Sequence, residues 1–151
     1  MMIIGIDPGI GGGIAVLTDK LRTYRMPDTY PGIFNLLSHI KDEASNGVSC
    51  ILEDVGKGRP GQSSKATATF ARHNGHLEMA LYALNIPTEK VTPQKWTKFY
   101  SNSIGKSTDY EGREWKKKLK QEAQMLYPGT NVTLYTADAI LIAHYGKQNY
   151  R

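Results

Sequence analysis

The sequence is poor in cysteine, and this scarcity excludes several kinds of protein. Cys50 is the only cysteine among 151 residues, so an internal disulfide or a multi-cysteine zinc site cannot form. Cys50 stands among Val48, Ile51 and Leu52, where a small buried thiol is the expected role. We therefore expect a reducing compartment, the cytoplasm, rather than secretion.

Long apolar runs and phosphate-binding loops are also missing. No stretch approaches the roughly 18 apolar residues of a membrane helix. The N-terminus lacks the basic and hydrophobic segments of a signal peptide. No Gly-x-x-x-x-Gly-Lys-Ser/Thr loop, internal repeat or low-complexity tract occurs. The length suits a single domain over residues 1–151.

Charge is unevenly distributed along the chain, whose formal net charge is +5. Nine basic residues lie between Lys90 and Lys120, against three acidic ones. Such a segment suggests a polyanionic partner such as nucleic acid, although a solvated helix face would produce the same pattern. The candidate DNA-contacting side chains are Lys57, Arg59, Lys65, Arg72, Lys106, Lys117 and Lys118.

The order of apolar segments predicts an α/β fold. Strands are expected at residues 3–7, 14–17, 21–25, 48–53 and 89–91, and helices at 33–44, 65–84, 111–127 and 134–145, with another beginning at Pro93. Short turns make the first three strands an antiparallel meander. The continuously apolar fourth strand is typical of a parallel, helix-covered region. In outline this is a ribonuclease H-like arrangement, a mixed five-stranded sheet flanked by helices.

Three acidic residues stand at the ends of predicted elements. Asp7 ends the first strand, Glu53 ends the fourth, and Asp138 is the only charge in an apolar helical segment. If the first and fourth strands are parallel neighbours, Asp7 and Glu53 emerge at the same edge. Each acid has an ordinary alternative, such as a turn at Asp7 or compensation of the helix dipole at Asp138.

Three converging carboxylates repel one another unless cations lie between them. Mg²⁺ prefers carboxylate oxygens, and two such ions can assist phosphodiester hydrolysis from both sides of the scissile bond. The sequence therefore predicts metal-assisted phosphodiester hydrolysis, with Asp7, Glu53 and Asp138 as metal ligands and catalytic residues.

Four motifs, in order and across essentially the whole chain, resemble RuvC-type Holliday junction resolvases, in particular the phage-encoded branch. They are Gly-Ile-Asp-Pro-Gly at 5–9, Leu-Glu at 52–53, Thr-Pro-Gln-Lys-Trp at 92–96 and Ala-Asp-Ala-Ile-Leu-Ile-Ala at 137–143. The resemblance implies a ribonuclease H-like homodimer that nicks opposed strands of a four-way DNA junction with Mg²⁺ or Mn²⁺. It further implies a bacterial or phage-infected host cell.

The resemblance also bears on single residues. Lys116 best matches a family lysine near the metal site, and its implied catalytic role is to offset charge on the phosphate. Tyr135 stands where the family carries a fourth metal-binding side chain. Asp54 and His144 are candidate substitutes, but neither spacing suits the role.

Two further functions fit parts of this pattern. One is a non-cleaving nucleic-acid-binding relative of the same fold. The other is an actin-like ATPase, which 151 residues are too few to build with two lobes. For a homodimer, the helix at 65–84 offers Phe70, Leu77 and Leu81 as a candidate interface, unless this face simply covers the sheet.

Overall fold

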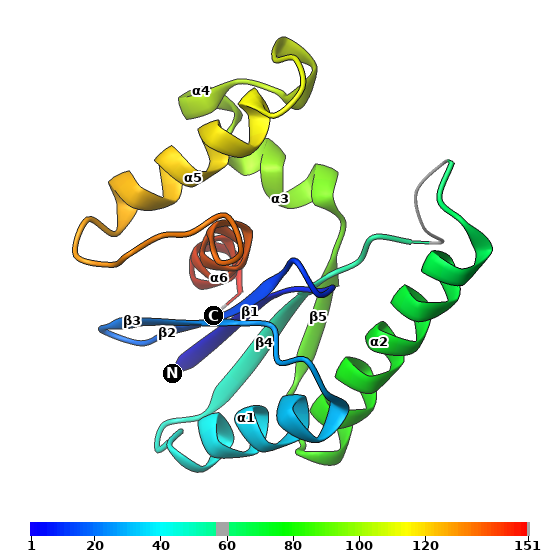
Figure 1. Ribbon diagram of the computed structural model, residues 1–151. Coiled ribbons are helices and arrows are strands. Elements are labelled where there is room, and N and C mark those ends of the chain that lie inside the picture. The colour runs from blue at the N-terminus through cyan, green and yellow to red at the C-terminus, as the bar shows by residue number, and fades with distance from the viewer. Residues whose placement is uncertain (57–60, 151) are drawn as a thin grey trace.

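The computed structural model describes residues 1–56 and 61–150 and contains one mixed sheet with helices on both faces (Figure 1). The strand order is β3-β2-β1-β4-β5. β1 pairs antiparallel with β2 and parallel with β4; β2–β3 is antiparallel and β4–β5 parallel. The strands are β1 Met2–Asp7, β2 Gly13–Leu17, β3 Leu21–Arg25, β4 Val48–Glu53 and β5 Thr88–Val91. The predicted ribonuclease H-like sheet is confirmed.

The helices form a layer on each side of this sheet. Figure 1 shows α1 and α2 on one face and α6 on the other, with α3 and α5 beyond α6. Their bounds are α1 Tyr30–Asp42, α2 Ser64–Ala83, α3 Pro93–Phe99, α4 Ser101–Ile104, α5 Glu114–Leu126 and α6 Ala137–Asn149, with a short 3-10 turn, η1, at Ser107–Asp109. Within the described residues, no helix has both the length and the apolar character needed to cross a membrane.

Helix α3 begins as the sequence predicts, and two short helical elements follow it. The Thr92 side chain accepts a hydrogen bond from the backbone N–H of Lys95, and Pro93 occupies the first turn. These elements, α4 and η1, lie within residues 100–110. Two phenol groups anchor them, because the Tyr100 hydroxyl donates to the Leu141 carbonyl and the Tyr110 hydroxyl to the Ile104 carbonyl. The first of these contacts links the segment to α6, and the second closes the segment on itself.

Helix α6 packs directly against the sheet through glycines on both elements. A Cβ atom at Gly5 of β1 would lie 2.3 Å from the Ala139 carbonyl oxygen. One at Gly146 of α6 would lie 2.5 Å from the Ile51 side chain. The sequence predicts that the helix ends at Gly146, whereas it continues to Asn149. The close approach explains why a residue that disfavours helix by about 1 kcal/mol is placed there.

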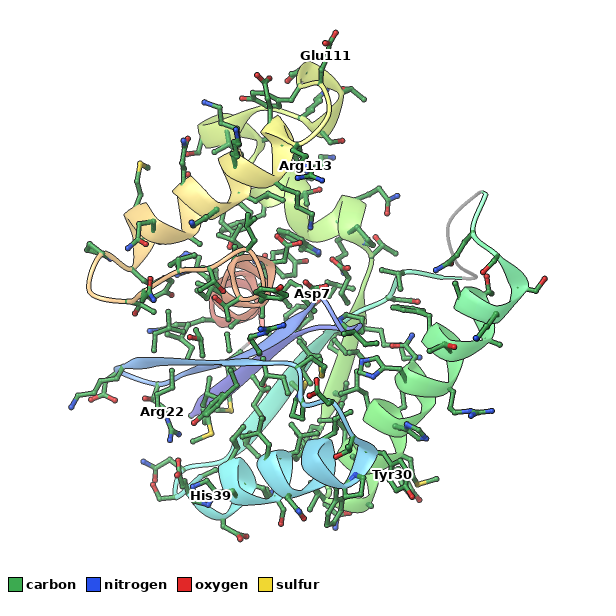
Figure 2. All side chains as sticks on the ribbon, viewed as in Figure 1. Asp7, Arg22, Tyr30, His39, Glu111 and Arg113 are labelled. Atoms are coloured by element: carbon green, nitrogen blue, oxygen red, sulfur yellow. The ribbon has the colours of Figure 1, made fainter. Side chains whose placement is uncertain are left out.

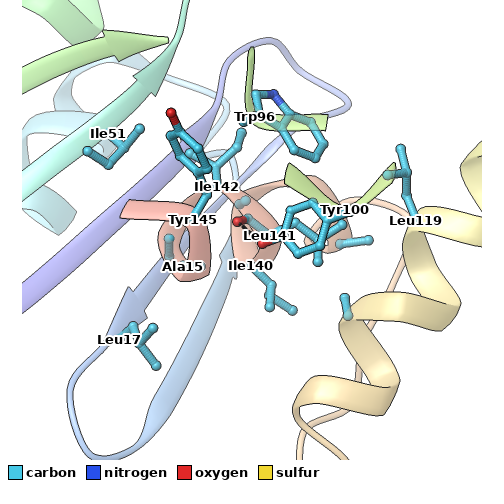
Figure 3. Close-up of a cluster of buried hydrophobic side chains, with 14 of the residues drawn as sticks. Ala15, Leu17, Ile51, Trp96, Tyr100, Leu119, Ile140, Leu141, Ile142 and Tyr145 are labelled. Atoms are coloured by element: carbon cyan, nitrogen blue, oxygen red, sulfur yellow. Dashed lines mark hydrogen bonds between the residues drawn. The ribbon is translucent and has the colours of Figure 1, made fainter. Parts of the chain in front are cut away.

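The sheet separates two hydrophobic cores. Figure 3 shows the core under α6, where Trp96 and Tyr100 pack around Ile140 and Leu141. The opposite core lies under α1 and α2 and includes Ile4, Ile6 and Cys50. Cys50 is fully buried and burial raises the pKa of its thiol, which fits its predicted structural role.

The apolar face of α2 belongs to this second core. Leu77 and Leu81 are 0% and 1% exposed and pack beneath the sheet. The prediction that they form a dimer interface is therefore wrong, because side chains buried within one chain cannot contact another. The alternative interpretation, that this face covers the sheet, is correct.

Candidate active site

The three acidic residues singled out above line one cavity of about 630 Å³. Asp7 ends β1 and Glu53 ends β4, and the parallel register that pairs Ile6 with Leu52 brings both carboxylates to the same edge. Asp138 lies in the first turn of α6, which packs over this edge. Glu53 and Asp138 are only 7% and 5% exposed. The topology therefore brings together acids from three separate elements.

Lys116 of α5 supplies a positive charge beside these acids. Its ammonium group forms a salt bridge with the Asp138 carboxylate. Partial burial alone would lower the pKa of Lys116, but attraction to Asp138, and then to Asp7 and Glu53, raises it above the ordinary value. Lys116 is thus cationic at neutral pH and lies within the field of all three carboxylates.

Trp96 of α3 holds the Glu53 carboxylate. Its indole Nε1–H donates a hydrogen bond of 2.6 Å to Oε2 of Glu53, and its ring is 1% exposed. A charge-assisted bond of this kind fixes the orientation of a nearly buried acid. Sequence analysis used Trp96 only as part of a motif and missed this contact. The available signal was its place in the first turn after β5, the strand that pairs with β4.

The cavity combines charged and apolar walls. Phe70 and Leu134 form part of its apolar wall, and Leu134 is 59% exposed. Phe70 therefore lies at the carboxylate site, not with Leu77 and Leu81. The remaining lining residues are Pro8, Gly9, Gly11, Gly12, Val55, Gln62, Arg113 and Lys117.

The comparisons with known proteins point to one fold. No protein-family model matches the chain, and no curated protein matches it in sequence. The Thermus thermophilus RuvC structure matches with a TM-score of 0.61 and 14% identity, over 98% of this chain and 96% of that one. T. thermophilus RuvC in complex with Holliday junction substrate matches with a TM-score of 0.64 and 13% identity, over 97% and 92%. The chain has a RuvC-like fold.

In this RuvC-like fold the chemistry of the donor set suits a hard divalent cation. Three carboxylates face one cavity, two of them nearly buried, and carboxylate oxygens are the ligands that Mg²⁺ prefers. Across residues 1–56 and 61–150, however, no three His, Cys, Asp or Glu side chains are gathered closely enough to hold an ion as they stand. The acids share a cavity without forming a ready-made metal cage.

None of the candidates for a fourth ligand is among the residues lining the cavity. Oδ1 of Asp54 accepts a hydrogen bond from the Gly56 backbone N–H. Nδ1 of His144 lies 2.8 Å from the Tyr127 hydroxyl, between α5 and α6. The ring of Tyr135 is stacked against the Arg25 guanidinium, 3.7 Å from Cζ to the ring centroid.

The basic residues predicted to bind DNA are spread over several places. Lys117 lines the carboxylate cavity, and Lys65 lines a neighbouring groove beside Phe70. Lys118 lies 5.7 Å from the Tyr110 ring centroid. Arg72 and Lys106 are exposed away from the cavity, and Lys57 and Arg59 lie outside the described residues.

Arg113 is a cavity residue that sequence analysis did not assign. It lines the cavity with Lys116 and Lys117, and in the view of Figure 2 it lies above Asp7. The sequence did contain a signal, because Arg113 stands three positions before Lys116 at the start of the same basic helix.

Proposed function

We propose that this chain is a metal-dependent, structure-selective DNA endonuclease that nicks four-way (Holliday) or other branched junctions in recombination, repair or phage DNA processing. The observation that carries the proposal is the convergence of Asp7, Glu53 and Asp138 in one cavity beside Lys116. A protein of the same fold is in complex with Holliday junction substrate, which supports branched DNA as the partner. The phage-encoded branch, the cytoplasmic setting and a single nuclease domain over residues 1–151 belong to the proposal through the sequence alone.

Asp7, Glu53 and Asp138 would hold Mg²⁺ or Mn²⁺. When bound, such ions supply the charge that activates a water and stabilises the leaving oxygen of a phosphodiester. Trp96 keeps Oε2 of Glu53 oriented. Lys116 places its ammonium where negative charge builds on the phosphate, so it acts on the rate.

The rest of the cavity would position the substrate. Arg113 and Lys117 line its charged side and suit backbone phosphates, which fix the register of DNA without reading sequence. Phe70 and Leu134 line its apolar side, and an aromatic ring there suits stacking on a base exposed at a branch point.

Paired nicks across one junction require two sites at a fixed separation, which a two-fold dimer supplies. The homodimer is part of the proposal, but its interface must lie elsewhere than at Leu77 and Leu81, because both side chains are buried. Met79 and Tyr82 of α2 are 64% and 80% exposed and are the apolar candidates on this helix. Sedimentation of Met79→Glu/Tyr82→Glu as a monomer, with a dimeric parent, would support this surface; a monomeric parent would reject the dimer.

A non-cleaving DNA-binding relative is the second candidate. The lack of a ready-made three-residue metal group among the described residues favours it, as does Tyr135 in place of a fourth ligand.

A synthetic four-way junction separates these functions. The protein is incubated with the junction and with a linear duplex of the same sequence, in Mg²⁺ or Mn²⁺, with Asp7→Asn as the inactive control. Paired symmetric nicks in the junction alone support the endonuclease. Junction binding without nicks supports the second candidate, and no preference for the junction rejects both.

A further inference from the structure

Arg25 forms an unusual contact near the carboxylate cavity. The guanidinium of this exposed residue lies over the Tyr135 ring, with Cζ 3.7 Å from the centroid. Stacking of this kind holds the planar group in one orientation while leaving its N–H groups available. Within the described residues, no carboxylate forms an ion pair with Arg25. The structure therefore presents an oriented cation with no anionic partner among residues 1–56 and 61–150.

The strand register places this cation in the same row as Asp7. Asp7 pairs with Gly13 across β1 and β2, and Gly13 pairs with Arg25 across β2 and β3. Directly paired residues project their side chains from the same face of a sheet. Since neighbouring strands lie about 4.8 Å apart, the Arg25 and Asp7 backbones are about 10 Å apart.

That face is the one that α6 covers. Ala15 and Leu17, which follow Gly13 in alternation along β2, belong to the core under α6. The segment before α6 also packs closely against the row of paired residues that contains Gly13. A Cβ atom at Gly13 would lie 2.5 Å from the Tyr135 carbonyl oxygen. Tyr135, and with it the orientation of Arg25, is thus fixed against the strand that connects Arg25 to Asp7.

We propose that Arg25, held by Tyr135, binds a backbone phosphate of the DNA strand that crosses the cavity. This inference rests on the proposed function and extends the DNA path beyond Arg113, Lys116 and Lys117, which line the cavity. A guanidinium matches phosphate oxygens in geometry and charge. A separation of about 10 Å is short on the scale of a DNA strand, so the bound phosphate should lie within about three nucleotides of the scissile one.

Arg22 provides a matched control on the same strand. It projects from the opposite face, where its guanidinium forms a salt bridge with Glu43 beyond the end of α1. Figure 2 shows Arg22 near α1, away from Asp7. Arg22→Ala thus removes a half-buried arginine from β3 without touching the proposed DNA path.

The experiment measures junction binding at several salt concentrations in the Asp7→Asn background, so that the substrate stays intact. We expect Arg25→Ala to weaken binding about tenfold and to reduce the salt slope by about one. Arg22→Ala should match the parent in both binding affinity and salt slope. Arg25→Lys should recover part of the affinity, because it keeps the charge and loses the planar stacking.

Two further measurements test the pairing and the position. Tyr135→Ala should weaken binding less than Arg25→Ala, and the double variant should bind no more weakly than Arg25→Ala alone, whereas Tyr135→Phe should match the parent. A single uncharged methylphosphonate, moved along the strand, should weaken parental binding most at one position within about three nucleotides of the nick. The same substitution should leave Arg25→Ala unaffected.

The outcomes distinguish this inference from the proposed function. A protein with intact Asp7 that neither prefers nor nicks junction DNA overturns both. A parent that binds the junction, with Arg25→Ala binding equally well and showing only a lower melting temperature, overturns the inference alone. Additive losses in the double variant would also overturn the paired arrangement, because Tyr135 would then contact DNA independently.

Discussion

The two faces of the sheet bury different kinds of side chain. The core under α1 and α2 is built from apolar residues and the buried Cys50. The buried acids Glu53, Glu122 and Asp138 lie at strand or helix positions associated with the α6 side, where Trp96, Ser103 and Lys116 contact them. Burying a charge is unfavourable unless it is paired, so the acids of the second face require partners that the first face does not. The first face buries mainly apolar side chains, whereas the second also holds the acids to which we assign the proposed chemistry.

The largest expected effect comes from neutralising an acid of the α6 face. Asp7→Asn, Glu53→Gln or Asp138→Asn should lower junction cleavage by several orders of magnitude, because each removes a carboxylate that we propose holds the metal. Junction binding should remain nearly parental, since phosphate contacts elsewhere position the DNA. Single-turnover cleavage and anisotropy measure the two separately. Full activity in Asp7→Asn would reject the metal site.

Lys116 and Lys117 test whether neighbouring lysines on this face have different roles. Lys116→Ala should reduce single-turnover cleavage at saturating enzyme by about a hundredfold, because its ammonium lies beside Asp138 and would offset charge on the phosphate. Lys117→Ala should instead weaken binding and reduce the salt slope by about one. Equal rates for Lys116→Ala and the parent would refute the catalytic role.

Leu77 tests the apolar face. Leu77→Ala removes a fully buried side chain and should lower the free energy of unfolding by about 2–5 kcal/mol. Cleavage per folded molecule should stay at the parental level well below the melting temperature. Denaturant unfolding followed by cleavage assays makes the comparison, with Met125→Ala of α5, which is 70% exposed, as the control for stability. A selective loss of cleavage in fully folded Leu77→Ala would contradict the division between the faces.

The sequence predicted the topology because the strand ends carry local signals. Asp7 is followed by Pro8 and Gly9, Glu53 ends an apolar run, and both were expected at one edge once the strands were parallel. Prediction from the sequence failed where one pattern is compatible with two different tertiary arrangements. The apolar stripe with Leu77 and Leu81 fits a dimer interface and an internal core equally well. Gly146 has the signature of a helix end, but its close contact with Ile51 requires a glycine within the helix.

The contacts that side chains make at and near the candidate site were harder to predict from the sequence. The Trp96–Glu53 hydrogen bond joins residues that are 43 positions apart in the sequence. The Arg25–Tyr135 contact depends on how the segment before α6 packs against β2. Neither contact has a periodicity that a linear pattern would reveal. Both follow from the register of the sheet, which is determined only when all the elements pack.

Trp96 tests the difference between the two faces of the sheet, because it is both a core residue and a hydrogen-bond donor to a buried acid. Trp96→Phe keeps an aromatic ring and removes the donor to Glu53, so we expect Mn²⁺ affinity to fall by about 10–100-fold. Titration of Mn²⁺ into the DNA-free protein measures this without cleavage. Tyr100→Phe is the matched control, since it removes a buried hydroxyl bonded to the Leu141 carbonyl in the same core and should leave Mn²⁺ affinity unchanged. Equal affinity losses in both variants would indicate a general packing effect.

The smallest expected effect concerns His144, a half-buried residue on the α6 side. Burial lowers the pKa of His144 below the ordinary value, so the folded state binds its proton less readily than the unfolded state does. Stability should therefore rise with pH through the region below and around 6.5, and part of it should be lost on acidification. His144→Gln should reduce the acid-induced drop in melting temperature by about 1–2 °C. Burial also lowers the pKa of His73 on α2, so part of the drop should persist in His144→Gln and shrink further in the double variant with His73→Gln. An unchanged pH dependence in the double variant would show that neither imidazole carries the effect.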